Sequence, residues 1–132
     1  MADVTVQTLD GVAMRITAGR HELVADEPEP IGEDRGPDPY ALLLSALGAC
    51  TAMTVTLYAR RKGWPLESVS VAVTKHETHA DDCASGGYCH RAEVHVEFVG
   101  DLDEDQRHRL HDIATRCPVA RTLARGVDIA HV

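Results

Sequence analysis

The sequence has few aromatic side chains and no long run of basic residues. One Phe, one Trp and three Tyr are its aromatics in 132 residues, so Leu, Val and Ala must fill most of any core. The formal net charge is −8, and the one basic cluster is Arg60–Lys62. Nucleic acids and anionic membranes both favour positively charged partners. The composition therefore argues against a nucleic acid or a membrane as partner.

Export and membrane signals are also missing. No basic segment followed by a short apolar run opens the chain, and Ser45, Thr51, Thr54 and Thr56 interrupt its most apolar stretch. Four cysteines without an export signal are more typical of thiols, metal ligands or a redox pair than of structural disulfides. We therefore expect a protein of the reducing cytoplasm.

The hydrophobic pattern predicts a single α+β domain over residues 1–132. Apolar residues alternate with polar ones in several short runs, and two segments show helical spacing. The predicted order of elements is βββαββααβ. The predicted strands are 4–6, 12–16, 21–25, 68–74, 92–98 and 127–132, and the predicted helices are 38–62, 103–116 and 118–125.

The long helix organises this prediction. Asp38 can cap its first turn, Pro39 suits the first helical position, and Gly63 follows three basic residues at its end. Its apolar residues lie on all sides of the helix rather than along one stripe. A domain of this size has little else to cover such a helix, so we expect a homodimer.

Two cysteines have the local setting of a redox pair. Cys50 lies inside the long helix among the small residues Gly48, Ala49 and Thr51, and Cys117 lies at the start of a short helix before Pro118. Exposed amides at a helix start lower the pKa of a thiol, whereas burial raises it. The alternative is that both cysteines pack as small hydrophobic residues.

Two motifs give the chain a family resemblance. The pattern GPxPxxLLLxALGxCT at Gly36–Thr51 and the pattern RCPVxRTL at Arg116–Leu123 resemble the OsmC/Ohr family of thiol-dependent peroxidases. The resemblance implies an intertwined homodimer whose long helices are wrapped by sheets from both chains. It also implies that Cys50 attacks the peroxide and that Cys117 resolves the oxidised thiol.

The resemblance further implies an organic hydroperoxide as substrate, a dithiol as reductant, no required cofactor, and a role in oxidative stress. Organic hydroperoxide resistance members keep the attacking thiol ionised with an N-terminal arginine and an acid after the motif's proline. Here Tyr40 and Ala41 follow Pro39, and Ala120 stands where related sequences usually read CPVH. The candidate residues for supporting the thiolate are Arg15, Arg20, Arg35 and Tyr40.

A second cluster of chemically active side chains lies between the two later strands. The loop His76–His90 contains His76, His79, Cys83 and Cys89, and sulfur with imidazole is a ligand set that Zn²⁺ favours. The Cys-x5-Cys spacing is wider than usual, although Ser85, Gly86 and Gly87 would let the loop close. The alternatives are a zinc site and a solvated hairpin loop.

The remaining expectations concern one loop and a second class of function. The segment Asp26–Asp38 holds three prolines and several acids, which predicts a solvated loop. In place of a peroxidase, the same fold could serve a non-catalytic thiol, zinc or small-molecule binding protein, centred on Cys83 and Cys89 or on a pocket beside Cys50.

Overall fold

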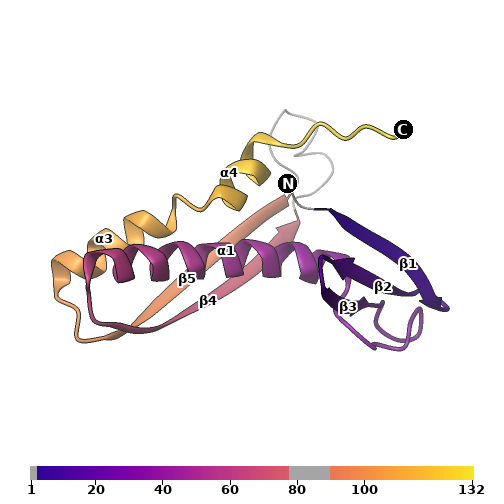
Figure 1. Cartoon of the computed structure of the whole chain (residues 1–132), viewed down its shortest axis with the longest axis horizontal. Coiled ribbons are helices and arrows are strands. Elements are labelled where there is room, and N and C mark those ends of the chain that lie inside the picture. The colour runs from indigo at the N-terminus through magenta and orange to yellow at the C-terminus, as the bar shows by residue number, and fades with distance from the viewer. Residues whose placement is uncertain (1–2, 78–89) are drawn as a thin grey trace. The chain divides into compact units, whose positions relative to one another are not determined.

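The computed structural model describes residues 3–77 and 90–132. Its helices and strands follow the order β1, β2, β3, α1, β4, β5, α3, α4 (Figure 1), which confirms the predicted α+β class. The chain divides into two compact units, Met1–Leu43 and Leu44–Val132, and each is described by itself. The segment 78–89, which holds His79, Cys83 and Cys89 of the predicted zinc loop, lies outside the described residues.

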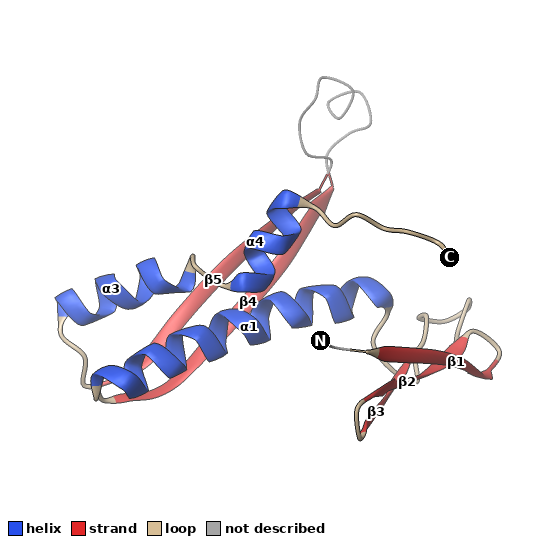
Figure 2. Ribbon diagram, turned by 45° about the horizontal axis from the view of Figure 1, so that its top comes forward, coloured by secondary structure: helices blue, strands red, loops and turns tan. Residues whose placement is uncertain are grey.

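The strands form two antiparallel sheets (Figure 2). In the first, β1–β2–β3, Val6 pairs with Ile16 and Ile16 with Leu23. In the second, the long hairpin β4–β5, Val71 pairs with Val96. The strands are β1 Val4–Asp10, β2 Ala13–Ala18, β3 His21–Ala25, β4 Leu66–Glu77 and β5 His90–Gly100. The helices are α1 Pro39–Lys62, α3 Glu104–Ala114 and α4 Pro118–Arg125.

The loop after β3 is organised by a buried acid. Asp26 is only 3% exposed, and its carboxylate accepts hydrogen bonds from the amides of Glu27 at 2.8 Å, Glu33 at 3.2 Å and Arg35 at 3.2 Å. A side chain at Gly32 would collide with this carboxylate and with the Glu27 carbonyl. The prediction of a loop is confirmed, but the prediction that it is simply solvated is wrong at Asp26.

Helix α1 begins and ends where the sequence predicts. The Ala41 amide donates to the Asp38 carboxylate at 2.7 Å, and Gly63 closes the other end with a φ of +70°, a conformation that glycine adopts without strain. Its buried residues, Leu47, Thr51, Val55 and Ala59, recur every fourth position. They form one stripe, because residues four apart lie on the same face of a helix.

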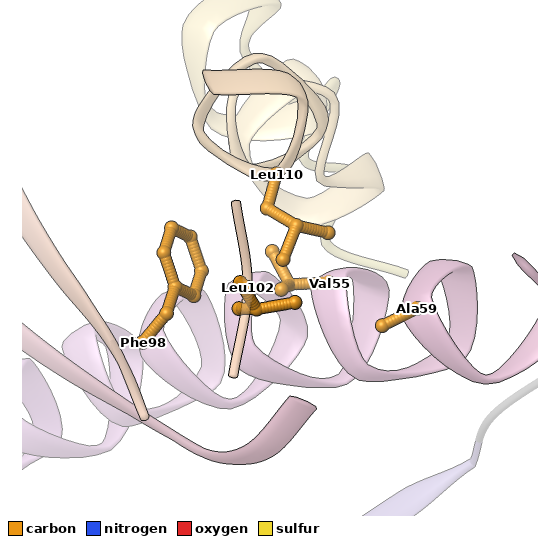
Figure 3. Packing of buried hydrophobic residues seen from close by; sticks show 5 residues of the cluster. All are labelled: Val55, Ala59, Phe98, Leu102 and Leu110. Carbon is orange, nitrogen blue, oxygen red and sulfur yellow. The ribbon is translucent and has the colours of Figure 1, made fainter. Parts of the chain in front are cut away.

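This stripe packs into the main core of the second unit. Val55, Ala59, Phe98, Leu102 and Leu110 form a buried cluster (Figure 3) that joins α1, β5 and α3. Figure 1 shows α1 running along the β4–β5 hairpin, and Gly48 lies 3.4 Å, measured from an ideal Cβ, from Val73 of β4. The core therefore fixes the middle of α1 against the second sheet.

Polar contacts fix α3 to the same framework. The predicted capping box at its start is confirmed, since Asp103 and Gln106 each accept from the other's backbone amide, at 2.8 and 3.0 Å. Arg107 donates to the carbonyls of Phe98 and Gly100 at 3.1 and 2.9 Å. Arg109 donates to the Tyr58 hydroxyl at 3.1 Å, which ties α3 to α1.

The predicted last strand, Val127–Val132, is wrong for the single chain. Residues 127–132 belong to neither a helix nor a strand, although three of the six are β-branched apolar residues. Val127 and Ile129 are 63% and 75% exposed. A strand needs a neighbouring edge for its backbone hydrogen bonds, and no strand of the described chain pairs with this segment.

Much of α1 is exposed in the single chain. Met53 and Leu57 are 64% and 59% exposed, as expected for a helix with apolar residues on every side. By length and composition alone α1 could cross a membrane, a test that core helices of soluble proteins also pass. The stripe that packs on Phe98 and Leu110 identifies α1 as a helix with at least one face in a protein core.

The buried acid gives a prediction for stability. Burial alone would raise the pKa of Asp26, but the amides of Arg35, Glu27 and Glu33, with the Arg35 charge, hold it below its ordinary value of 3.8. A carboxyl group with a lowered pKa stabilises the folded state above its unfolded pKa, and this contribution is lost as the pH falls through the folded pKa.

We therefore expect Asp26→Asn to lower the melting temperature, because one amide oxygen cannot replace a carboxylate that accepts three hydrogen bonds. The difference in melting temperature between Asp26→Asn and wild type should be largest near pH 7 and should shrink below about pH 4. Thermal unfolding followed by circular dichroism measures it. Asp34→Asn is the control, since Asn also tolerates the positive φ of this exposed residue. Equal melting temperatures for wild type and Asp26→Asn at pH 7 would contradict this account.

Candidate active site

Cys50 lies on α1 beside the buried stripe and is half-buried. Because it is inside a helix, the backbone amides around it are already bonded along the helix. The Thr54 hydroxyl donates to the Cys50 carbonyl at 2.7 Å, while its oxygen is 4.0 Å from the Cys50 sulfur. The proton of Thr54 is thus used on the backbone, and it gives the sulfur little stabilisation as an anion.

Cys117 occupies the N-cap position of α4 and is fully buried. Pro118 takes the first helical position, and the Arg121 amide donates to the Cys117 carbonyl at 3.2 Å as the first bond of the helix. The sulfur makes no capping hydrogen bond of regular geometry. It still lies close enough to the amides of Val119 and Ala120 for both to favour its ionised form.

The two thiols are 67 positions apart in the sequence, and each affects the pKa of the other. Their helices, α1 and α4, are shown in Figures 1 and 2. Both thiols are free, so no disulfide joins them. The sequence proposed this pair only through the family resemblance.

The pair is electrostatically unequal. Burial raises the pKa of Cys50, and the hydrogen bond and charge of Cys117 raise it further. Burial would also raise the pKa of Cys117, but the hydrogen bond from Cys50, the amides of Ala120 and Val119 and the Thr51 hydroxyl bring it below the ordinary value. The Thr51 hydroxyl donates its one proton to the Leu47 carbonyl at 2.8 Å, so this proton is not free for the Cys117 sulfur. The pKa values of the two thiols are therefore shifted in opposite directions.

A cavity of about 440 Å³ is lined by Thr51, the neighbour of Cys50, and by Ala120 of α4, although neither cysteine lines it. Its walls come from α1, β5, α3 and the start of α4, and they include Leu47, Val94 and Val96 with the histidine His111. Thr51 and Ala120 are shared, since they line this cavity and also act on the Cys117 sulfur. The small side chain at Ala120 leaves room at this point, and the walls suit an apolar group of modest size.

The other candidate thiolate-supporting residues belong to the first unit. Arg35 forms an ion pair with Asp10 at 3.7 Å, Arg15 lies in the middle of β2, and Arg20 lies at the turn before β3. Tyr40 is half-exposed in the first turn of α1. A role for these four residues at the thiols stays a prediction.

The zinc hypothesis also stays a prediction. Of its four ligands only His76 is described, and its Nε2 lies 3.5 Å from Glu93 on the neighbouring strand. Among residues 3–77 and 90–132, no group of three or more His, Cys, Asp or Glu side chains could hold a metal ion. His111, on α3, packs its ring edge-on against Phe98 with a centroid distance of 4.8 Å.

Sequence reasoning missed Thr51, Val119 and Ala120 as neighbours of the thiols. Thr51 follows Cys50 directly, but only its place in the buried stripe shows that it faces α4. The amides of Val119 and Ala120 follow from a helix start at Pro118, which the sequence did predict. The position of the two amides could therefore be predicted from the sequence, whereas the role of Thr51 depends on tertiary packing.

The chain is similar to a known family and to several solved structures. A family model for OsmC-like proteins matches residues 32–132. An OsmC-like protein from Mycoplasma pneumoniae is 26% identical, with a TM-score of 0.78 over 96% of this chain and 89% of that chain. OhrB, the organic hydroperoxide resistance protein of Bacillus subtilis, is 21% identical, with a TM-score of 0.66 over 97% and 93%.

An organic hydroperoxide resistance protein OsmC from Legionella pneumophila is 18% identical, with a TM-score of 0.65 over 97% of this chain and 92% of that chain. A search among curated proteins found no match. The last two structures support the fold alone, since their identities are low, while the family model covers most of this chain.

Proposed function

Because this chain belongs to the OsmC family, we propose that it reduces organic hydroperoxides with the Cys50–Cys117 pair. The family as a whole is associated with osmotic stress and hydroperoxide resistance. The observation that carries the proposal is a pair of free thiols that shift each other's pKa, near a cavity with apolar walls at Leu47, Val94 and Val96. Perturbed thiols at a cavity are typical of reactive cysteines.

The proposed cycle needs only the two sulfurs, a peroxide and an external dithiol. Cys50 is the more accessible thiol, so it attacks the distal peroxide oxygen, and an alcohol leaves as Cys50 becomes a sulfenic acid. Cys117 then displaces the hydroxyl group from Cys50 and forms a disulfide. A dithiol of the cytoplasm reduces this disulfide, and no cofactor takes part.

The cavity supports an organic substrate rather than hydrogen peroxide. Its apolar walls at Leu47, Val94 and Val96 would bury an alkyl or aryl group beside the thiols. Hydrogen peroxide has no apolar part to bury there. The named activity of the organic hydroperoxide resistance relatives agrees with this choice, and oxidative stress is the setting in which such a substrate forms.

We further propose that the working form is a homodimer in which a second copy covers α1. The exposed Met53 and Leu57 and the exposed residues 127–132 form apolar surface that soluble monomers seldom show. A second copy can bury α1 and offer a strand edge to 127–132. The same exposed surface would otherwise favour aggregation.

Oxidative trapping tests the thiol cycle. After cumene hydroperoxide, digestion under non-reducing conditions should release a peptide pair joined by Cys50 and Cys117. In Cys117→Ser, a dimedone-type probe should label a sulfenic acid on Cys50, because the resolving sulfur is missing. Oxidation that joins Cys83 to Cys89 and spares Cys50 would refute the cycle. A cavity that binds apolar ligands with no oxidation of Cys50 would favour the non-catalytic binding protein.

Light scattering tests the dimer. Wild type should give about twice the chain mass of 14.3 kDa, and the double variant Met53→Glu, Leu57→Glu should dissociate or fail to accumulate as a soluble protein, because two carboxylates would be buried. His108→Glu, which adds an acid at an exposed polar site of α3, should remain a dimer. A wild-type monomer at micromolar concentration would refute the proposal.

A further inference from the structure

Asp112, in the last turn of α3, accepts four hydrogen bonds. Its carboxylate oxygen Oδ2 accepts from Arg109 Nη1 at 3.0 Å and from Arg116 Nη2 at 2.8 Å. Its backbone carbonyl accepts from the Thr115 amide at 3.2 Å and from the Thr115 hydroxyl at 2.6 Å. Asp112 is therefore bonded to both residues that connect α3 to Cys117.

The same network reaches α1. Arg109 Nε donates to the Tyr58 hydroxyl at 3.1 Å, and the guanidinium carbon of Arg109 lies 5.6 Å from the centroid of the Tyr58 ring. Arg109 thus contacts α1 with one part of its guanidinium and Asp112 with another. A continuous set of contacts runs from α1 through Arg109 and Asp112 to Arg116, the residue before Cys117.

Cys117 depends on its backbone neighbours for its position. It is fully buried, and its side chain makes no capping hydrogen bond to α4. On its C-terminal side, the Arg121 amide donates to the Cys117 carbonyl at 3.2 Å. On its N-terminal side, the Arg116 amide donates to the Ile113 carbonyl at 2.9 Å, and the Arg116 side chain is held by Asp112. The connection 115–117 therefore sets where the Cys117 sulfur lies.

The ion pairs of Asp112 are partly exposed, which limits their effect on stability. The side chains of Arg109, Asp112 and Arg116 are 44%, 45% and 48% exposed, and such pairs contribute little to the free energy of unfolding. A misplacement of about 1 Å can still slow a reaction strongly. We therefore expect this network to affect the geometry of a reaction more than the stability of the fold.

On the premise of the proposed peroxidase function, we propose that Asp112 and Arg116 are positioning residues for the resolving step. In that step the Cys117 sulfur bonds to the sulfur of the Cys50 sulfenic acid and the S–O bond breaks. The hydroxyl group leaves as water with the proton of the Cys117 thiol. The Cys117 sulfur is oxidised as the Cys50 sulfur is reduced, so the step needs no further reactant. Asp112 and Arg116 act on it through the backbone of residues 115–117.

The first test separates the two chemical steps in the variant Cys83→Ser, Cys89→Ser. Timed acid quenching after cumene hydroperoxide, followed by mass spectrometry, distinguishes a sulfenic acid, which has gained oxygen, from a disulfide, which has lost hydrogen. Asp112→Ala should leave the first oxidation of Cys50 within about twofold and should slow disulfide formation roughly fivefold, the upper range for an exposed ion pair. Unchanged disulfide formation, or equal slowing of both steps, would overturn the proposal.

The second test asks whether Asp112 and Arg116 act together. Arg116→Ala should also slow disulfide formation, and the double variant should be no slower than Asp112→Ala alone, because the bond between the two residues is already lost. Arg116→Lys should recover much of the rate, since it keeps a positive donor beside Asp112. Effects of the two alanine substitutions that multiply in the double variant would show independent action and overturn the proposal.

Asp105→Ala is the matched control. Asp105 is an exposed acid of α3 for which the described residues show no ion pair, so this variant should keep wild-type rates at both steps. Slowing of disulfide formation by Asp105→Ala to the same degree would assign the effect to the helix as a whole and overturn the proposal. Asp112→Asn provides the same comparison if Asp112→Ala does not fold, because it removes only the charge.

A measurement without peroxide separates this proposal from the proposed function. Equilibration with reduced and oxidised glutathione gives the fraction of Cys50–Cys117 disulfide in each variant. Asp112→Ala should need a glutathione ratio roughly fivefold more oxidising than wild type for half oxidation, and equal ratios would overturn the positioning role. If glutathione forms the disulfide but cumene hydroperoxide leaves Cys50 unoxidised, the peroxidase function fails, and the glutathione ratios alone decide the positioning role.

Discussion

The contact between Cys50 and Cys117 is the interaction on which the functional part of this structure depends. It exists because the buried stripe of α1 packs on the β4–β5 hairpin and α3, and because α3 leads directly to the start of α4. A helix interior supplies one sulfur and a helix start supplies the other. Burial and the interaction between the two thiols, together with the amides of Val119 and Ala120, shift their pKa values in opposite directions.

Burying a charged sulfur is costly unless its surroundings stabilise it. Here the Cys50 side chain and the amides of Ala120 and Val119 lower the pKa of the buried Cys117. The neighbouring cavity then gives the site its apolar side, through residues of α1, β5 and α3. Thr51 and Ala120 therefore have two roles, because they line the cavity and also affect the pKa of Cys117.

The features that the sequence predicted best are helix ends, which depend on residues close by in the chain. Asp38 and Gly63 fix the ends of α1, and the Asp103–Gln106 capping box fixes the start of α3, because caps depend on neighbouring residues. The sequence did not predict that Asp26 is buried, because three amides from later in the loop surround it. Val127–Val132 has β-branched residues suited to a strand, but no strand of the described residues pairs with it. The opposite pKa shifts of the two thiols likewise depend on tertiary packing of α1 and α4.

Family membership supports Cys50 and Cys117 as the pair of the proposed chemistry, and this proposal assigns no step to Cys83 or Cys89. The most direct measurement is steady-state reduction of cumene hydroperoxide by a dithiol, with each cysteine replaced by serine in turn. The account predicts that Cys83→Ser and Cys89→Ser keep wild-type activity and that Cys50→Ser and Cys117→Ser lose nearly all of it. Full activity in Cys50→Ser, or its loss in Cys83→Ser or Cys89→Ser, would contradict the account.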